Sequence, residues 1–453
     1  MYKKVKDPIH FIGIGGIGMS GIAQVLAAQG YPVSGSDLVE SDTVKKLRNL
    51  GIRVSIGHKA ENLANAKIVV VSSAVKKDNH EIVEAKRLEI PIVARAEMLA
   101  EIMRLKFGIA VAGTHGKTTT TSMLATILFG AQEDPTIIVG GKVDALGGNA
   151  KLGKGKFLVA EADESDGSFL SLSPVVTIIT NIDNDHLDFY GQMEKLRSAF
   201  VNFANKVPYY GRSIVCIDDI ETAKIIPMLS KPLWTYGFSE DAQFQITDFK
   251  VTNTGSKFSL KRDGAALGEV RLQVPGKHNA RNAVAAIAAA LEIDLSFEQA
   301  VAALENFSGV RRRFEKKGHH ASGALVIDDY GHHPTEIEAT LSAAKSFSKG
   351  RVIAVFQPHR FSRTQLCWDS FAKAFELADT VVLADIYPAG EAPIDGIDSS
   401  HLAQHIAQNH KDCRYAGKLS EIPSQVSNLL SKDDLLVLLG AGNITQLSGE
   451  FVS

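Results

Sequence analysis

The sequence predicts an α/β protein of three domains, on three observations. Its 453 residues are too many for one hydrophobic core, and roughly three domains of ordinary size suit that length. Two glycine-rich segments, near residues 13 and 113, each follow a short apolar run and precede a helical pattern. Beyond residue 311, apolar strands alternate with helical segments, which is typical of a parallel sheet. We therefore expect three α/β domains, over residues 1–103, 104–310 and 311–453.

The composition is that of an ordinary globular protein, with 45% hydrophobic residues, 22% charged residues and a net charge of −2. A nearly neutral chain gives no electrostatic reason to expect nucleic acid or an acidic membrane surface as a partner. The three cysteines lie far apart and form no CxxC pair, so we expect reduced core thiols and no zinc site. No apolar run approaches the roughly 18 residues of a membrane span, and the N-terminal run is too short for a signal peptide. We expect a cytoplasmic protein.

The first domain opens with a strand followed by glycines at positions 13, 15 and 18, the spacing of dinucleotide-binding folds. A helix is expected over residues 20–29 and a second strand over residues 31–37. Asp37 then stands about 20 residues past the glycines, where such folds hold a ribose hydroxyl. We predict a Rossmann-like domain that binds a pyrophosphate-bearing nucleotide. The motif does not choose between NAD and a nucleotide sugar, and tight helix–strand packing without a ligand is the alternative.

A further buried strand of this domain, over residues 68–73, ends in the hydroxyls of Ser72 and Ser73. Ligands of open α/β sheets bind at the carboxyl ends of the strands, so both serines are candidate ligand contacts. Residues 91–97 end the domain.

The second glycine-rich segment has the pattern of a phosphate-binding loop. An apolar strand over residues 109–112 leads into the turn 113–116, and a helix beginning at Lys117 and Thr118 runs to about residue 128. Backbone N–H groups at a helix N-terminus bind anions, the lysine reaches the terminal phosphates, and the threonine hydroxyl can hold Mg²⁺. Val111 stands where the usual pattern has its first glycine, so the loop is a shortened variant. We predict ATP binding by a P-loop ATPase-like α/β domain, through Gly113, Thr114, His115, Gly116, Lys117, Thr118 and Thr119.

Two later strands of the central domain run into polar segments. The strand over residues 156–161 leads into four carboxylates, and Glu161, nearest the strand, is the best candidate ligand for Mg²⁺. The other three acids are equally well explained as a solvated turn. The strand over residues 175–180 is followed by an acidic segment containing His186, which we expect in the metal shell or beside the phosphates.

Between residues 241 and 274 the apolar pattern changes to period two around Asp263 and Gly264, which predicts a small antiparallel addition. An alanine-rich helix follows over residues 280–291. Asn279 is either the N-cap of this helix or, with His278 and Asn282, faces a nucleotide base. Both readings stay open.

The third domain repeats strand and helix, so the loops after its strands emerge on one edge of a Rossmann-like parallel sheet. Pro334 suits the first position of a helix, which leaves His332 just before a positive helix end. Arg360 and Arg363 can present two guanidinium forks to a carboxylate or phosphate. We predict a small anionic or zwitterionic ligand here. Three ligands on three domains favour an ATP-driven joining reaction.

The chain resembles the Mur ligase family throughout its length. Seven segments carry the resemblance, in the family's order: GIGGIGMSG (13–21), GTHGKTT (113–119), EADESD (161–166), NIDNDH (181–186), GKHN (276–279), DDYGHHPTE (328–336) and QPHRFSRT (357–364). The shortened phosphate loop is that family's own form.

The resemblance implies a reaction of peptidoglycan precursor synthesis in which L-alanine is joined to UDP-N-acetylmuramate. The lactyl carboxylate would attack the γ-phosphorus of ATP, and the amine of L-alanine would then displace phosphate from the acyl phosphate. Two alternatives are kept: a relative that attaches a whole tripeptide to the same sugar nucleotide, and a nucleotide-binding regulator or dehydrogenase with a degenerate ATP site. Lys117, Thr118 and Glu161 are all present, which disfavours the last of these.

The resemblance also implies a role for each matching residue. The cofactors would be ATP with Mg²⁺, or Mn²⁺ in its place, and the protein a monomer or weak homodimer. Lys117, His332, Arg360 and Arg363 would be catalytic, with His332 a candidate base for the ammonium proton. The resemblance places the diphosphate of the sugar nucleotide near Gly15, Gly16 and Ile17, to which the spacing and strand-end arguments above add Asp37, Ser72 and Ser73. It places the metal at Thr118, Glu161 and His186, and ATP also at Asn279 and Asn282. The amino acid would meet Tyr330, His332, Arg360 and Arg363.

Overall fold

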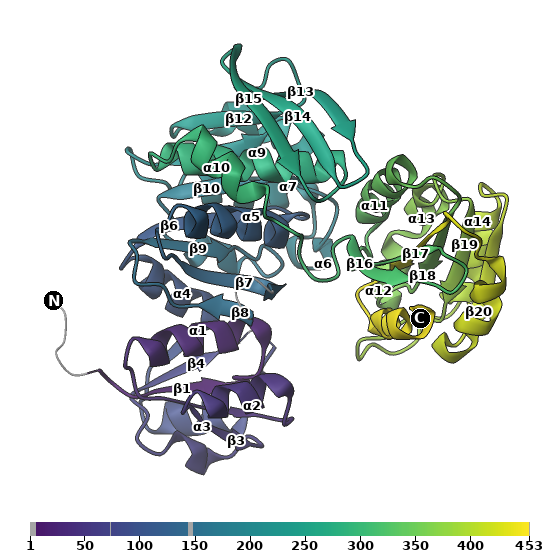
Figure 1. The fold of residues 1–453 in the computed structure, drawn as a ribbon. Coiled ribbons are helices and arrows are strands. Elements are labelled where there is room, and N and C mark those ends of the chain that lie inside the picture. Colours follow the sequence, from purple (N-terminus) through teal and green to yellow (C-terminus); the bar gives the residue numbers. More distant parts are fainter. Residues whose placement is uncertain (1–5, 73, 144–147, 453) are drawn as a thin grey trace. The chain divides into compact units, whose positions relative to one another are not determined.

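The computed structural model describes residues 6–72, 74–143 and 148–452. Three sheets, of five, ten and six strands, confirm the predicted α/β class (Figure 1). The chain separates into two compact units, each treated by itself below: residues 1–247, 260–268 and 281–304 in the first, and residues 248–259, 269–280 and 305–453 in the second. The domain boundaries near residues 103 and 310 stay predictions.

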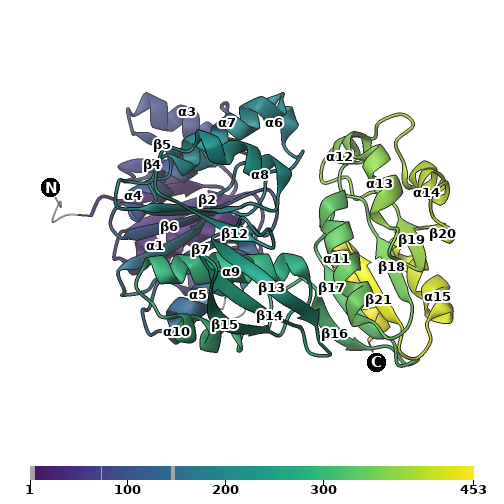
Figure 2. The ribbon, with the colours of Figure 1, turned by 90° about the horizontal axis from the view of Figure 1, so that it is seen from above.

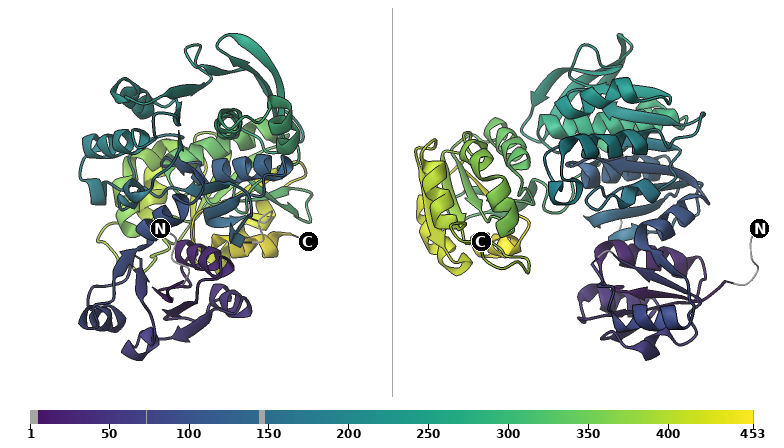
Figure 3. Two further views of the ribbon diagram at one scale, coloured as in Figure 1. Left: turned by 90° about the vertical axis from the view of Figure 1, so that its left-hand side faces the viewer. Right: turned by 180° about the vertical axis from the view of Figure 1, so that it is seen from behind.

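The N-terminal sheet is parallel throughout and has the order β3-β2-β1-β4-β5. Ile9 and Phe11 pack under α1, α2 and α4, while Ile12 packs under α3 on the opposite face, so helices cover both faces (Figure 3). This is the predicted Rossmann-like arrangement. Its elements are β1 (Ile9–Ile12), α1 (Ile17–Ala28), β2 (Val33–Asp37), α2 (Asp42–Asn49), β3 (Arg53–Ile56), β4 (Ile68–Val71), α3 (His80–Arg87), β5 (Ile92–Ala94) and α4 (Arg95–Met103).

The central sheet has the order β15-β14-β13-β12-β11-β10-β6-β9-β7-β8. The strands from β7 through β9, β6, β10, β11 and β12 to β13 pair in parallel, whereas β8 pairs antiparallel with β7. Helices α5 and α10 pack against each other on one side of the sheet and α7 and α8 lie on the other (Figure 2). The strands are β6 (Phe107–Ala112), β7 (Thr136–Val143), β8 (Gly148–Lys151), β9 (Phe157–Glu161), β10 (Val176–Ile179), β11 (Arg212–Cys216), β12 (Leu233–Gly237), β13 (Phe244–Val251), β14 (Ser256–Arg262) and β15 (Ala265–Leu272). The helices are α5 (Lys117–Gly130), α6 (Leu187–Tyr190), α7 (Met193–Ala204), α8 (Ile220–Ile225), α9 (Lys277–Glu292) and α10 (Phe297–Leu304).

The predicted antiparallel addition is confirmed at the edge of this sheet. Strands β14 and β15 are neighbours joined by Asp263 and Gly264, whose φ angles are 49° and 81°. Two positive φ angles are what a two-residue hairpin turn of type I′ requires, and Asp-Gly is a preferred pair for it.

The C-terminal sheet has the order β16-β17-β21-β18-β19-β20, and only the edge strand β16 runs antiparallel to its neighbour. One face packs against α11, α13 and α14, and the other against α15 and α16. The predicted common edge for the loops after these strands is confirmed. The strands are β16 (Glu315–His319), β17 (Leu325–Asp329), β18 (Val352–Phe356), β19 (Thr380–Ala384), β20 (Cys413–Gly417) and β21 (Leu435–Leu439). The helices are α11 (Pro334–Phe347), α12 (Phe361–Leu366), α13 (Trp368–Ala374), α14 (Ser399–Ala407), α15 (Ile422–Val426) and α16 (Ser448–Phe451).

The membrane-span and cysteine expectations concern the described part of the chain. Among the described residues, no helix combines the length and the apolar character that crossing a membrane demands. Cys216, Cys367 and Cys413 are all free thiols, the first two buried.

Candidate active site

The phosphate loop is formed where the sequence predicted it, between β6 and α5. Gly113 and Gly116 have φ angles of 133° and 81°, and α5 begins at Lys117. A Cβ atom on Gly113 would lie 2.0 Å from Thr180 Oγ1, and one on Gly116 would lie 2.7 Å from Asn282 Oδ1. Both glycines are therefore required by backbone conformation and by close neighbours.

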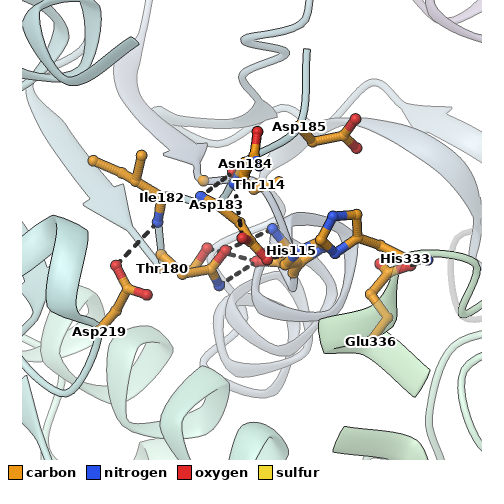
Figure 4. A network of polar contacts seen from close by, with 12 residues as sticks. Thr114, His115, Thr180, Ile182, Asp183, Asn184, Asp185, Asp219, His333 and Glu336 are labelled. Atoms are coloured by element: carbon orange, nitrogen blue, oxygen red, sulfur yellow. Dashed lines mark hydrogen bonds and ion pairs between the residues drawn. The ribbon is translucent and has the colours of Figure 1, made fainter. Parts of the chain in front are cut away.

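The loop is held by the segment that follows β10 (Figure 4). The carbonyl of His115 accepts hydrogen bonds from Thr180 Oγ1 at 2.6 Å and Asn181 Nδ2 at 2.9 Å. In return, the backbone N–H groups of Thr114 and His115 donate to the main-chain and side-chain oxygens of Asn181 at 3.1 and 2.8 Å. The backbone of the loop is thus fixed before any phosphate binds, which limits the reorganisation that binding demands.

A histidine–carboxylate pair adds to this link. His115 Nε2 lies 2.9 Å from Asp183 Oδ2, and the backbone N–H of Asp183 donates to Thr114 Oγ1 at 2.9 Å. Asp219 in turn accepts the backbone N–H of Ile182 at 3.2 Å, and burial raises the pKa of Asp219 above its ordinary value (Figure 4).

Lys117 is bound by a buried carboxylate. Its Nζ lies 2.9 Å from both carboxylate oxygens of Glu164 and donates to the carbonyl of Gly113 at 2.7 Å. Burial acts to lower the pKa of Lys117, but the surrounding carboxylates of Glu164, Glu161 and Asp163 outweigh it and raise that pKa. Burial raises the pKa of Glu164, with Lys117 opposing the shift. The side chain of Glu164 is only 1% exposed, so the solvated-turn interpretation, which the sequence left open for this residue, is wrong.

Oxygen donors for a metal meet beside the loop. Thr118 Oγ1 donates to Glu161 Oε2 at 2.9 Å, so the two predicted ligands are adjacent. A hydroxyl and a carboxylate next to a phosphate loop are hard oxygen donors that suit Mg²⁺. His186 Nε2 lies 3.8 Å from Glu164 Oε1 and 3.7 Å from Asp185 Oδ2, so it neighbours the carboxylate that holds Lys117.

The two asparagines of α9 differ in their surroundings. Asn279 is the third residue of the helix, and its Nδ2 donates to the carbonyl of Pro275 at 2.7 Å, so the N-cap reading is wrong. Asn282, in the first unit, is buried against Gly116 of the phosphate loop. An amide at this place can contact a nucleotide held by the loop.

The glycine-rich segment before α1 borders a pocket of about 320 Å³. Gly16, Ile17 and Ser72 line this pocket, and Glu161 lies at its other side. Asp37 lies behind the segment, where its Oδ2 accepts the backbone N–H of Gly15 at 2.8 Å. This carboxylate therefore fixes the glycine loop, a role that the spacing rule did not predict. Ser73 lies outside the described residues.

In the second unit, Tyr330 and His332 form one cluster after β17. Their rings are 5.4 Å apart, and His332 Nδ1 lies 3.1 Å from the carbonyl of Tyr330 and 3.3 Å from Glu336 Oε2. Burial lowers the pKa of His332 to about 4, with Glu336 opposing and Arg363 adding to the shift. The imidazole is therefore neutral near pH 7.

Arg360 and Arg363 are placed by the start of α12. Arg360 is the N-cap, with a φ angle of 69°, and its backbone N–H donates to the carbonyl of Tyr387 at 2.9 Å. Arg363 Nη1 lies 3.5 Å from His359 Nδ1, and the ring of His359 lies 5.8 Å from that of His332. The structure thus brings Tyr330, His332 and Arg363 together through His359, while Arg360 is exposed.

Three further residues of this unit were missed. The guanidinium groups of Arg312 and Arg313 lie 5.0 and 5.1 Å from the centre of the Tyr330 ring. Asp329 accepts the backbone N–H groups of Phe314 and Gly331 at 2.7 and 2.8 Å, and burial raises its pKa to about 6. The run of three arginines was the available signal for the first two.

Comparison with known proteins agrees with this geometry. Family models match in order: "Mur ligase family, catalytic domain" over residues 8–107, "Mur ligase middle domain" over 111–290, and "Mur ligase, glutamate ligase domain" over 312–442. The chain is 52% identical over 449 residues to the UDP-N-acetylmuramate–L-alanine ligase of Geobacter sp. (strain M21), covering 99% of this chain and 97% of the relative. The corresponding ligase of Sulfurihydrogenibium sp. (strain YO3AOP1) is 49% identical over 449 residues, covering 99% and 98%.

Solved structures show the same architecture. The UDP-N-acetylmuramate–alanine ligase of Thermotoga maritima superposes with a TM-score of 0.82 at 33% identity, covering 98% of each chain. A murein peptide ligase of Psychrobacter arcticus 273-4 superposes with a TM-score of 0.69 at 26% identity, again covering 98% of each chain. Because full-length relatives share about half of its residues and the family models match all three of its sheets in order, the chain belongs to the Mur ligase family.

Proposed function

We propose that this protein is an ATP-dependent ligase that joins L-alanine to the lactyl carboxylate of UDP-N-acetylmuramate, releasing ADP and phosphate, in peptidoglycan precursor synthesis. The observation that carries the proposal is the phosphate loop, in which Lys117 is held beside the oxygen pair of Thr118 and Glu161. The relatives that are about half identical over their full length bear the name of this activity.

The chemical difficulty is to bring a carboxylate to the γ-phosphate of ATP, because both are anions. Lys117 supplies a fixed positive charge whose pKa is raised, so it stays protonated at neutral pH. Preorganised charges of this kind stabilise the negative charge of the transition state. Thr118 and Glu161 would hold Mg²⁺, which, when bound, neutralises charge on the phosphate oxygens.

The nucleotide is oriented by the rest of the loop. The turn from Gly113 to Gly116 is proposed to surround the phosphates, with the N–H groups of the first turn of α5 facing them. The N–H groups of Thr114 and His115 instead donate to Asn181 and keep the turn in place. Asn282, packed on Gly116, and Asn279 in the same helix are proposed to contact ATP.

L-Alanine is proposed to bind in the second unit, at Tyr330, His332, Arg360 and Arg363. Arg363 can pair with the amino-acid carboxylate. His332 is neutral, and its Nδ1 faces the oxygens of Tyr330 and Glu336, which leaves Nε2 as an acceptor for the ammonium group. A pKa of about 4 makes this imidazole a weak proton acceptor at pH 7, so we propose that it orients the amine.

One assay tests the proposal. Purified protein with ATP, Mg²⁺ and UDP-N-acetylmuramate is given either L-alanine or the tripeptide, and phosphate release is followed. We expect release with L-alanine. Absence of release with L-alanine would refute the proposal, and release with the tripeptide alone would establish the peptide-attaching activity of the murein peptide ligases.

A further inference from the structure

The pocket between the glycine-rich segment and β9 is lined by an arginine, Arg95, that belongs to none of the sequence motifs. The pocket has a volume of about 320 Å³, and its lining includes Gly16 and Ile17 on one side, Glu161 and Asp163 on the other, and Arg95. Arg95 is the first residue of α4. Given the proposed function, this pocket connects the place of the sugar nucleotide with the oxygen pair beside the phosphate loop.

Arg95 lies directly against the first turn of α1. A Cβ atom on Gly18 would lie 2.7 Å from Arg95 Nη1 and 3.3 Å from its Cδ. A side chain at Gly18 would push the guanidinium away from this turn, so the glycine lets Arg95 lie against it. A positive charge is thereby placed at a helix N-terminus, where backbone N–H groups already favour an anion.

The guanidinium has a loosely placed carboxylate partner. Arg95 Nη2 lies 3.8 Å from Asp163 Oδ2, and the two side chains are 23% and 45% exposed. An exposed pair at this separation is weak, and a doubly charged ligand can replace the carboxylate.

We propose that Arg95 binds the diphosphate of the sugar nucleotide, and that Asp163 holds the guanidinium until the diphosphate takes its place. The N-terminus of α1 indicates where the diphosphate binds. Its oxygens accept the N–H groups of the first turn of α1, and Arg95 covers that same turn at Gly18. Arginine suits this role because its planar fork matches two phosphate oxygens at once.

Steady-state kinetics with Arg95→Ala test the assignment. We expect the KM for UDP-N-acetylmuramate to rise by roughly 10- to 100-fold, as for loss of a hydrogen bond to a charged group, with kcat and the KM values for ATP and L-alanine nearly unchanged. Arg95→Lys is expected to recover part of the affinity, because it keeps the charge but not the fork. The matched control is Arg104→Ala, which removes an exposed arginine from the other end of α4 and is expected to leave all constants unchanged.

A second comparison identifies which anion Arg95 meets. UDP-N-acetylglucosamine carries the diphosphate but no lactyl carboxylate, so we expect it to compete with the substrate in the unaltered protein. In Arg95→Ala we expect its inhibition constant to rise by the same factor as the KM for UDP-N-acetylmuramate. A lower kcat at unchanged KM, or undiminished competition by UDP-N-acetylglucosamine, would place Arg95 at the lactyl carboxylate and overturn the assignment.

Asp163→Asn tests the exchange of partners. Removing the competing carboxylate is expected to lower the KM for UDP-N-acetylmuramate by roughly two- to fivefold, the range of an exposed ion pair. A raised KM would mean that Asp163 positions Arg95 for the ligand, which contradicts the exchange. Normal turnover with an unchanged KM in Arg95→Ala overturns the role of Arg95 alone, whereas absence of turnover in the unaltered protein overturns the proposed function as well.

Discussion

At the scale of single residues, the ion pair of Lys117 and Glu164 joins catalysis to stability. Both side chains are largely buried, and Nζ lies 2.9 Å from each carboxylate oxygen. Breaking such a pair by removing one partner is costly, because the remaining charge stays buried without compensation. The γ-phosphate of ATP must therefore compete with Glu164 for the lysine.

Lys117→Ala is expected to reduce kcat by at least roughly 100-fold, because a preorganised positive charge is lost from the site of phosphoryl transfer. The variant is also expected to melt at a lower temperature than the parent, since Glu164 loses its partner. Without Lys117, burial raises the pKa of the Glu164 carboxyl in the folded protein above its value in the unfolded chain. The loss of stability therefore grows as pH rises. Turnover by phosphate release and melting temperature between pH 5 and 8 measure the two effects.

The double variant Lys117→Ala with Glu164→Gln separates these effects. It is expected to recover most of the lost melting temperature, because no buried charge remains, while kcat stays at least roughly 100-fold below that of the parent. Normal turnover in either variant would mean that the loop does not act on the γ-phosphate.

Acid sensitivity of the second unit follows from His332 and His359. Burial lowers the pKa of each to about 4, against an ordinary value of 6.5. As pH falls through 6.5, the unfolded chain takes up protons that the folded chain takes up only near pH 4, so stability falls on acidification across this window. We expect the melting temperature to drop less between pH 7 and pH 4.5 in His332→Gln than in the parent protein. His80→Gln, at an exposed residue that begins α3, is the control and is expected to keep the parent's slope.

The role of a residue could be predicted from sequence where a motif fixes its position beside a ligand. It could not be predicted where the contact is made only when the chain folds. Thr118 and Glu161 were predicted as a metal pair, and their oxygens lie 2.9 Å apart. Glu164 could not be chosen because four carboxylates stand close together in the sequence after β9. Only the fold of the segment after this strand determines which of them is buried against Lys117. Asp37 accepts the backbone N–H of Gly15, a contact between segments 22 residues apart that the spacing rule does not contain.

At the scale of elements, the phosphate loop depends on its contact with the end of β10. Thr180 and Asn181 bind the loop's backbone on one side, and His115 and Asp183 pair on the other. The loop and this segment therefore form one preorganised element, although they are more than 60 residues apart in the chain.

Gly113→Ala is expected to break this element. The added Cβ would lie 2.0 Å from Thr180 Oγ1 and 3.0 Å from backbone atoms, at a φ of 133° that alanine rarely adopts. We expect the melting temperature to fall by several degrees, as for roughly 1–3 kcal/mol of overpacking, and ATP to give no further thermal stabilisation. Thermal shift with and without ATP measures both.

The matched control is Gly449→Ala, because a Cβ there meets nothing within 4 Å. It lies in α16 and is expected to leave melting temperature and ATP stabilisation unchanged or slightly raised. Undiminished ATP stabilisation in Gly113→Ala would show that the loop adapts, contrary to its description as preorganised.

Elements could be predicted from sequence where the apolar pattern is strong. The buried strand β18 occupies residues 352–356 as expected, because its five residues are all apolar and all buried. In contrast, α1 begins at Ile17, earlier than the predicted Ser20, because Gly16 is already its N-cap. Strand β3, with the pattern exposed, buried, partly buried, exposed, was not predicted, since one buried residue leaves no period to detect.

At the scale of the whole molecule, the order of chemical events can be tested by following the formation of each product. The phosphate loop lies in the first unit and the proposed amino-acid site in the second. If the lactyl carboxylate is the group that is phosphorylated, ADP formation needs the sugar nucleotide and does not need L-alanine.

Rapid-quench measurement of ADP gives the decisive comparison. With ATP, Mg²⁺ and UDP-N-acetylmuramate but no amino acid, we expect a burst of up to one ADP per protein molecule that then stalls, because the acyl phosphate has no amine to meet. Addition of L-alanine should release the stall and give continuous turnover. UDP-N-acetylglucosamine, which has no lactyl carboxylate, should give no burst and serves as the control. ADP formation that depends on L-alanine in the absence of the sugar nucleotide would mean that the amino-acid carboxylate is the one activated, and the proposed direction of the reaction would be wrong.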